Sequence, residues 1–238
     1  MTPAYPLIMM AAIGAGAIIS RFTQSELRIN KRDKFLIGLA AFSGSMIGAK
    51  LPFVFFDISR ALEGGALLGS GKTIMCGLVG GYFGVELAKW YLGVRTKTGD
   101  SFAVPVAVSI GIGRLACFAG GCCFGTPTNS SWGVVFPHID HLKRHPTQLY
   151  ESAFHLIMAI FLWALWRRQA FRGQLIKLYF LTYFAYRFCT EFIRPEARLF
   201  GGLTGYQWAA LAWVPLFAWL WHHDSRKFQR PMSPAENA

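Results

Sequence analysis

Charged side chains are scarce in this sequence. Of 238 residues only 15% are Asp, Glu, Lys or Arg, whereas 53% are hydrophobic. Two stretches, Met1 to Ser20 and Leu199 to His223, contain no charged residue. Each is long enough to cross the ~30 Å hydrocarbon core of a bilayer as a helix. The composition therefore argues against a soluble globular enzyme and indicates an integral membrane protein.

Acidic residues are scarcer than basic ones, 12 against 24, and the net charge is +12. A nucleic-acid-binding protein gathers such an excess on one face or stripe. Here the basic residues fall in short clusters between apolar runs. We therefore expect no nucleic-acid partner and interpret the clusters as determinants of membrane topology.

Seven apolar stretches have the length of a membrane helix. They are approximately residues 4–19, 35–56, 73–91, 102–124, 149–166, 174–192 and 203–221. Backbone amides in lipid must be satisfied internally, and the alternation typical of a membrane β-barrel is missing. We predict one all-α domain of seven transmembrane helices over residues 1–238, with an extramembrane segment at about 125–148.

The orientation follows from the loops. Those on one side carry 14 Lys and Arg, and those on the other carry six: Arg60, Lys72, Lys143, Arg144, Arg194 and Arg198. The richer side is expected to be cytoplasmic. With seven spans, this places the N-terminus and the 125–148 segment outside and the C-terminus inside. No basic residue precedes the first span, so we expect it to remain in the mature protein.

Cysteines number five, which gives no even disulfide framework. Only the pair Cys122–Cys123 stands out, because it precedes the 125–148 segment. That segment contains His138, His141 and His145, which raises the alternative of a metal site on the outer face. The separation of Cys123 from His138 matches no tight ligand spacing. We predict no metal and no cofactor.

Charges within a bilayer cost several kcal/mol unless they face the bundle interior, so each is a functional candidate. Lys50, Arg114 and Arg187 all fall in the outer half of their predicted helices, whereas Lys177 near a cytoplasmic end can snorkel. Glu191 and Arg194 follow Arg187 at i+4 and i+7, which predicts one helical stripe.

Two interpretations of this stripe remain open. Glu191 neutralises Arg187 in a structural ion pair, or the surplus positive charge of Arg114, Arg187 and Lys50 holds an anionic headgroup. Guanidinium groups match the geometry of phosphate.

A second polar group begins the fifth span. Pro146 is expected to start this helix, with Thr147 and Gln148 in its first turn. His145, Tyr150 and Glu151 would then present polar groups at the outer boundary. Alternatively, Glu151 only complements the helix dipole.

Three motifs and two shorter matches, in order along the chain, carry a resemblance to a known family. Residues 113–128 read GRLACFAGGCCFGTPT, residues 144–151 read RHPTQLYE, and residues 187–196 read RFCTEFIRPE. Tyr5 and the Gly48–Leu51 run match two earlier family positions. Together they resemble the prolipoprotein diacylglyceryl transferase family.

The resemblance implies seven membrane helices with an active site open to the outer leaflet of the bacterial plasma (inner) membrane. It implies transfer of diacylglycerol from phosphatidylglycerol to a thiol of a prolipoprotein or another thiol-bearing acceptor. The expected catalytic residues are Arg114, Arg187 and Glu191. The expected substrate-binding residues are Tyr5, Lys50, Cys117, Cys122, Gly125, His145, Gln148, Tyr150, Glu151 and Arg194.

The chain departs from the family pattern at three places. Cys117 and Cys122 stand where Asn and Glu are usual, and Met75 or Val79 stands for a usual histidine. Glu191, Glu151 and His145 are then the nearest candidates for a base. Two alternatives stay open: a non-catalytic phospholipid-binding or transport protein, and a thiol- or metal-active protein.

The two adjacent thiols are expected to differ. If both continue the fourth helix, Cys123 lies about 100° from Cys122. Only Cys122 would then face the cavity. The alternative is that both are small packing residues that let helices approach closely.

Overall fold

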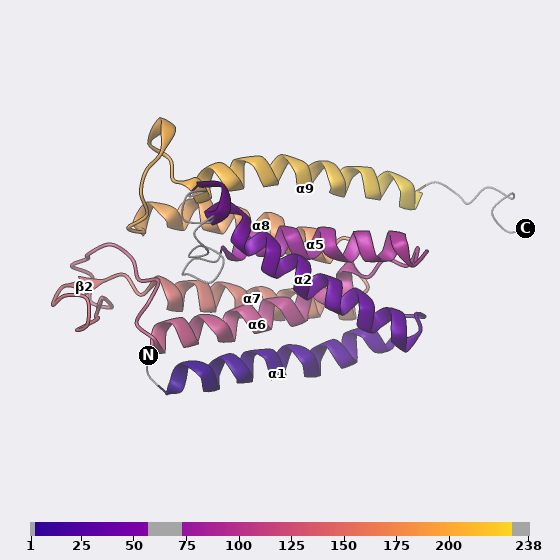
Figure 1. The fold of residues 1–238 in the computed structure, drawn as a ribbon, viewed down its shortest axis with the longest axis horizontal. Coiled ribbons are helices and arrows are strands. Elements are labelled where there is room, and N and C mark those ends of the chain that lie inside the picture. Colours follow the sequence, from indigo (N-terminus) through magenta and orange to yellow (C-terminus); the bar gives the residue numbers. More distant parts are fainter. Residues whose placement is uncertain (1–2, 57–72, 230–238) are drawn as a thin grey trace, which may run out of the picture. The chain divides into compact units, whose positions relative to one another are not determined.

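The computed structural model describes residues 3–56 and 73–229, which are mostly helical (Figure 1). The α-helices are α1 (Ala4–Ser25), α2 (Lys31–Phe56), α5 (Ile74–Tyr91), α6 (Gly99–Ala119), α7 (Thr147–Arg167), α8 (Leu175–Thr190) and α9 (Gly205–Gln229). The short elements are β1 (Val134–Val135), β2 (Lys143–Arg144) and two 3-10 turns, η1 (Glu191–Ile193) and η2 (Phe200–Gly202). Arg60 and Lys72 of the topology argument lie outside the described residues.

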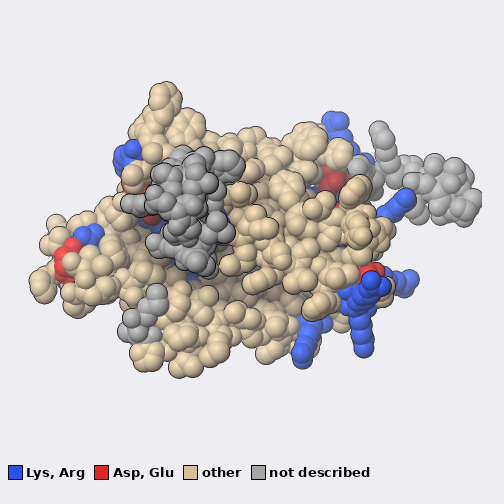
Figure 2. All heavy atoms as spheres, viewed as in Figure 1, with Lys and Arg blue, Asp and Glu red and all other residues tan. Residues whose placement is uncertain are grey.

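An α-helix covers most of each predicted span. Four of these helices are long and apolar enough to cross a membrane, namely Ala4–Ser25, Lys31–Pro52, Gly99–Ala119 and Thr147–Arg167. Large apolar side chains point outward from them, as Leu7 at 61% and Ile160 at 73% exposure illustrate. Most of the surface shown over the helices in Figure 2 carries no charge. The fold is therefore that of an all-α membrane protein.

The predicted fourth span was too long at its end. It was expected to reach Phe124, but α6 ends at Ala119. Gly121 adopts φ +67°, and the Cys122 N–H donates back to the Cys117 carbonyl at 3.1 Å. This left-handed turn is a common way to close a helix, and glycine adopts it without strain. Cys122 and Cys123 therefore lie in a turn, and the prediction that they occupy successive helical positions is wrong.

The sixth span also ends early. Helix α8 stops at Thr190 and η1 follows, so Arg194 is extended at φ −108°, ψ 149°. Pro195 comes next, and a residue before proline is disfavoured in the helical region. Arg194 therefore leaves the helical stripe that its spacing to Arg187 predicted.

The chain divides into two compact units, Met1–Thr23 with Asp100–Ala238, and Gln24–Gly99. We call them unit 1 and unit 2. Unit 2 holds α2 and α5, which approach through glycines. A Cβ built on Gly80 would lie 2.3 Å from the Gly44 carbonyl oxygen, and one on Gly48 would lie 2.4 Å from the Cys76 carbonyl oxygen. Small residues allow this backbone contact, as is typical of membrane helices.

Unit 1 packs α6 against α1 and α7, and α8 against α7 and α9. The Thr23 hydroxyl donates to the Ser101 carbonyl at 2.7 Å, and the Ser152 hydroxyl donates to the Gly111 carbonyl at 2.7 Å. Between α8 and α9, Phe180 packs edge-on against Phe217 with ring centroids 5.1 Å apart. These contacts connect the helices of unit 1 along their lengths.

Lys177 does not snorkel. Its side chain is only 2% exposed, and its ammonium donates to Gln174 Oε1 at 2.8 Å and pairs with Asp224 of α9. Because a carboxylate reaches it inside the protein, the amine has no need to extend to water. The snorkelling prediction is therefore wrong.

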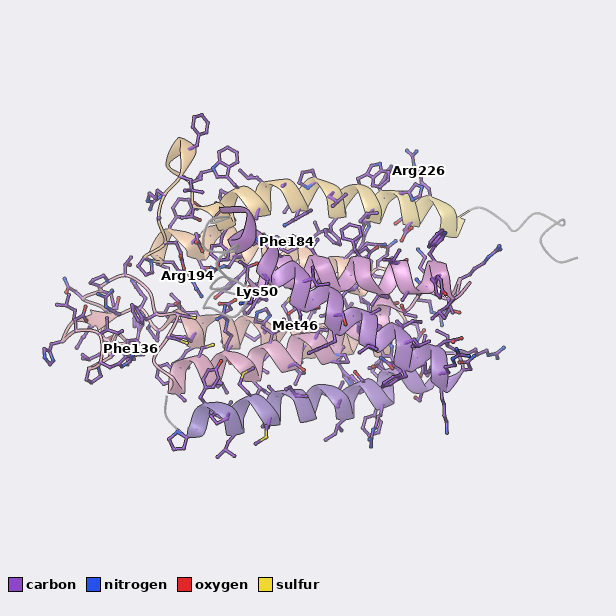
Figure 3. All side chains as sticks on the ribbon, in the orientation of Figure 1. Met46, Lys50, Phe136, Phe184, Arg194 and Arg226 are labelled. Atoms are coloured by element: carbon purple, nitrogen blue, oxygen red, sulfur yellow. The ribbon has the colours of Figure 1, made fainter. Side chains whose placement is uncertain are left out.

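The 125–148 segment contains a small hairpin that the sequence did not predict. Strands β1 and β2 pair antiparallel, with Val134 opposite Arg144. Phe136 is buried and packs against Phe124 with ring centroids 5.5 Å apart. Figure 3 shows Phe136 and Arg194 at the same end of unit 1, with Arg226 at the other end.

Candidate functional site

Glu151 on α7 is the centre of a buried polar group. Its side chain is 1% exposed, and Oε2 lies 2.8 Å from the guanidinium groups of both Arg114 and Arg194. The other oxygen, Oε1, accepts a hydrogen bond from the Tyr183 hydroxyl at 2.7 Å. Glu151 was expected at the outer boundary, but it lies inside the bundle because α6 and α8 both direct a polar side chain toward it. Pro146 precedes α7, as predicted.

A second buried ion pair lies at the end of α8. Arg187 and Glu191 are 3.0 Å apart and are 3% and 0% exposed. The Thr204 hydroxyl donates to Glu191 Oε1 at 3.0 Å, and the Arg187 guanidinium lies 4.4 Å from the centre of the Tyr206 ring. The i,i+4 ion pair expected from the sequence is therefore present, and its neighbours fix both partners in position.

Together these residues form what we call the arginine cluster: Arg114, Arg187, Arg194, Glu151 and Glu191. Three guanidinium groups face two carboxylates, which leaves one positive charge in excess. Within the described residues, each arginine also keeps one buried nitrogen without a hydrogen-bond partner: Arg114 Nε, Arg187 Nη1 and Arg194 Nε. Unpaired buried donors are costly. An anion with several acceptor oxygens, such as a phosphate, would neutralise the excess positive charge and accept hydrogen bonds from the unpaired nitrogens.

Gly125 connects two parts of this site. Its N–H donates to the His145 carbonyl at 2.8 Å, and the next N–H, of Thr126, donates to the Ile193 carbonyl at 2.9 Å. A Cβ on Gly125 would lie 2.7 Å from both His145 Cβ and the Ile193 carbonyl oxygen. Only glycine fits here, so Gly125 brings the segment that leads to Arg194 close to the start of α7.

Three further predicted residues lie around the beginning of α7. Gln148 is fully buried and donates from Nε2 to the Cys122 carbonyl at 2.6 Å. The Tyr150 hydroxyl lies 3.3 Å from His145 Nδ1, and both side chains are half-buried.

The predicted cysteines meet in what we call the thiol cluster, formed by Cys117, Cys122 and Cys123. Their sulfurs all lie within 4.8 Å of one another. Arg114 Nη1 lies 3.8 Å from Cys117 Sγ, which places the thiol cluster beside the arginine cluster. The prediction that Cys122 and Cys123 point in different directions is wrong, because the turn after α6 brings both sulfurs to Cys117.

Tyr5 reaches the same turn from α1. A Cβ on Gly120 would lie 3.0 Å from the Tyr5 ring. The histidines take other contacts: His138 Nε2 lies 2.9 Å from the Gly121 carbonyl oxygen and His145 faces Tyr150. Lys50 belongs to α2 of unit 2, where it follows Met46 by one turn (Figure 3). The arginine and thiol clusters belong to unit 1.

Sequence reasoning missed His155 and the tyrosines beside it. His155 is fully buried, with Nε2 3.9 Å from Glu151 Oε1 and Nδ1 2.8 Å from the Tyr179 hydroxyl. A signal existed, because His155 follows Glu151 at i+4 and Tyr179, Tyr183 and Arg187 repeat at i+4 along α8. Two such stripes on consecutive helices are able to face each other.

Known proteins resemble this chain over most of its length. The family model described as prolipoprotein diacylglyceryl transferase matches residues 3–223. A Clostridium tetani protein is 30% identical over 217 residues, which cover 82% of this chain and 85% of that protein. A Nitratidesulfovibrio vulgaris protein is 32% identical over 189 residues, which cover 74% and 72% of the two chains.

A third relative, from Nitrosomonas europaea, is 31% identical over 204 residues, which cover 77% of this chain and 72% of that protein. All three are named phosphatidylglycerol–prolipoprotein diacylglyceryl transferase. The match extends through every helix from α1 to most of α9 and includes both clusters. The chain therefore belongs to the prolipoprotein diacylglyceryl transferase family.

Proposed function

We propose that this protein transfers the diacylglyceryl group of phosphatidylglycerol to a cysteine thiol of a prolipoprotein. The observation that carries the proposal is the arginine cluster, with one positive charge in excess and an unpaired donor on each guanidinium. Family membership and the names of the relatives support it. The enzyme is a multi-pass protein of the bacterial plasma membrane, with seven spans, its N-terminus outside and its C-terminus inside.

The reaction explains why fixed cations are needed. The acceptor sulfur attacks the carbon of the diacylglycerol moiety that carries the phosphate, a C–S bond forms, the C–O bond to that carbon breaks, and glycerol phosphate leaves. Negative charge grows on the departing phosphate. Preorganised donors in a water-poor site each stabilise such a charge by about 3 kcal/mol. Glu151 holds Arg114 and Arg194 in place, so no reorganisation is required when the charge develops.

The acceptor thiol must also lose a proton, because a free thiol has a pKa near 8.5. Of the three bases expected from the sequence, Glu151 and Glu191 are engaged in ion pairs. His145 instead faces the neutral hydroxyl of Tyr150 and is half-buried. We therefore assign the proton to the His145 imidazole.

Turnover by the purified protein tests the proposal. Phosphatidylglycerol labelled in its headgroup is supplied with a peptide that carries a lipobox cysteine, and with the same peptide carrying serine. We expect release of labelled glycerol phosphate and a matching mass increase of the cysteine peptide only. Saturable lipid binding without release would overturn catalysis in favour of a non-catalytic lipid-binding protein. The His145→Asn variant should bind lipid normally but turn over slowly.

Topology is tested separately. Single cysteines are placed at Asn129 and Ala170 in a cysteine-free background, and intact cells are treated with an impermeant thiol reagent. We expect labelling at Asn129 and none at Ala170 until the cells are opened. The reverse pattern would place the 125–148 segment in the cytoplasm and contradict the proposed access from the outer leaflet.

A further inference from the structure

The thiol cluster has the dimensions of a metal site. Cys122 and Cys123 have their sulfurs 3.7 Å apart, and all three sulfurs fall within 4.8 Å of one another. With metal–sulfur bonds of ~2.3 Å, three thiolates around one ion are about 4 Å apart. The sulfur separations are therefore close to those of a coordinating arrangement.

The backbone that carries these thiols is already fixed. Thr147 Oγ1 donates to the Cys123 carbonyl at 2.8 Å and Gln148 Nε2 donates to the Cys122 carbonyl at 2.6 Å. Cys123 itself adopts φ 63°, a conformation uncommon for residues other than glycine. Such strain persists only where the surroundings impose it, and it occurs preferentially at functional sites. The first turn of α7 therefore holds the cysteine turn in a conformation that brings the sulfurs together.

The donor set determines which ion fits. In the described part of the chain, the group contains three sulfurs and neither imidazole nor carboxylate. Hard cations prefer oxygen ligands, and structural zinc sites are almost always four-coordinate. Soft thiolates select Cu(I). Unlike structural zinc, Cu(I) needs no fourth ligand beyond the three sulfurs of the thiol cluster. We propose that Cys117, Cys122 and Cys123 bind one soft thiophilic cation of the Cu(I) type in trigonal coordination.

A neighbouring arginine offsets part of the charge that the occupied site would carry. On binding, each ligating thiol releases its proton, so three thiolates and one monovalent cation carry a net charge of −2. Arg114 Nη1, 3.8 Å from Cys117 Sγ, offsets part of this charge. Cys122 and Cys123 are exposed, which gives an ion a path to the site.

Competition with a chelator tests the site without any measurement of transferase activity. Purified, reduced protein is titrated anaerobically into Cu(I) held by the coloured chelator bicinchoninate. We expect the protein to remove one Cu(I) per chain. The triple variant Cys117→Ser, Cys122→Ser, Cys123→Ser should compete at least about 100-fold less well. The matched variant Cys76→Ser, Cys189→Ser removes the other two thiols and should compete like the native protein.

Alkylation in the presence of Cu(I) identifies the ligands directly. Mass spectrometry should find Cys117, Cys122 and Cys123 protected and Cys189 modified, on protein that remains monodisperse. The triple variant must show the native helical circular dichroism, so that its loss of binding reports on ligands. Equal competition by the triple and native proteins, or Cu(I)-independent alkylation of the three thiols, would overturn the proposal. Extraction of Zn(II) from a chelator in preference to Cu(I) would overturn the trigonal assignment.

Discussion

The carboxylate of Glu151 lies 2.8 Å from the guanidinium of Arg114, and both side chains are buried. The same oxygen lies 2.8 Å from Arg194, so one carboxylate serves two arginines that are 80 residues apart in the chain. Breaking a buried pair leaves an uncompensated charge, which is more costly than the pair is worth. Glu151 therefore determines both the stability of the site and the positions of two of its three cations.

Replacing this carboxylate with its neutral isostere is the first test. Glu151→Gln keeps the volume but leaves two buried arginines facing one negative charge fewer. We expect a loss of about 3–5 kcal/mol in the free energy of unfolding, measured by denaturant titration in detergent, together with loss of turnover. Glu26→Gln changes an exposed carboxylate in the same way and serves as the control, with a cost below about 1 kcal/mol. Equal costs would contradict the central role of Glu151.

Lysine substitutions test whether the cations recognise phosphate by shape. Arg114→Lys and Arg187→Lys keep the charge but lose the planar fork. We expect each to lower kcat/KM by about 100-fold, equivalent to about 2.7 kcal/mol of transition-state stabilisation. Arg198→Lys, at an exposed position, should leave kcat/KM unchanged. Full activity of both buried variants would show that charge alone suffices.

Much of the fold could be predicted because membrane helices are specified locally. Long apolar runs and rare charges located the seven α-helices of the described residues. Helix ends were less accessible. The end of α6 depends on the left-handed Gly121, and the end of α8 depends on Pro195 acting on Arg194. The length of an apolar run does not reveal either of these two helix ends.

The site was harder to predict, because its pairings connect distant helices. Arg187 with Glu191 was accessible, since both lie on one helix at i+4. The contact of Arg114 with Glu151 depends on how α6 packs against α7, which no spacing encodes. His155 follows Glu151 at i+4, but its contact with Tyr179 of α8 depends on how α7 packs against α8. Residues that look like separate boundary or core positions in the sequence form one connected polar group once the helices pack together.

The glycine contact in unit 2 offers a test of packing. Gly80→Ala would place a Cβ 2.3 Å from the Gly44 carbonyl oxygen, so the backbones of α2 and α5 must separate. We expect a destabilisation of about 1–3 kcal/mol, typical of overpacking. Gly38→Ala on the same α2 meets nothing within 4 Å and should be neutral or up to about 1 kcal/mol stabilising. Thermal unfolding in detergent compares the two, and matching shifts would refute close backbone contact.

The ion pair of Asp140 and Arg144 makes the hairpin of the 125–148 segment sensitive to pH. Arg144 Nε donates to Asp140 Oδ2 at 3.2 Å, and this hydrogen bond lowers the pKa of the Asp140 carboxyl. Red and blue atoms lie side by side in Figure 2 where Figure 1 draws β2. Because the pKa is lower in the folded state, the pair contributes its full stability above the ordinary Asp pKa of about 4. The contribution disappears as the pH falls through the lowered pKa.

Hydrogen exchange measures this dependence. The Thr128 N–H, which donates to the Lys143 carbonyl at 2.8 Å, reports on β2, the strand that carries Arg144. After correction for intrinsic rates, its protection should decrease as the pH falls below about 4. High salt should reduce the effect, because the pair is partly exposed and screened. Asp140→Asn keeps an acceptor for the Leu142 N–H but has no charge to lose. In this variant, protection of the Thr128 N–H should be lower than in the native protein at neutral pH and should not change as the pH falls. An unchanged acid-induced loss of protection in Asp140→Asn would assign the pH response to another group.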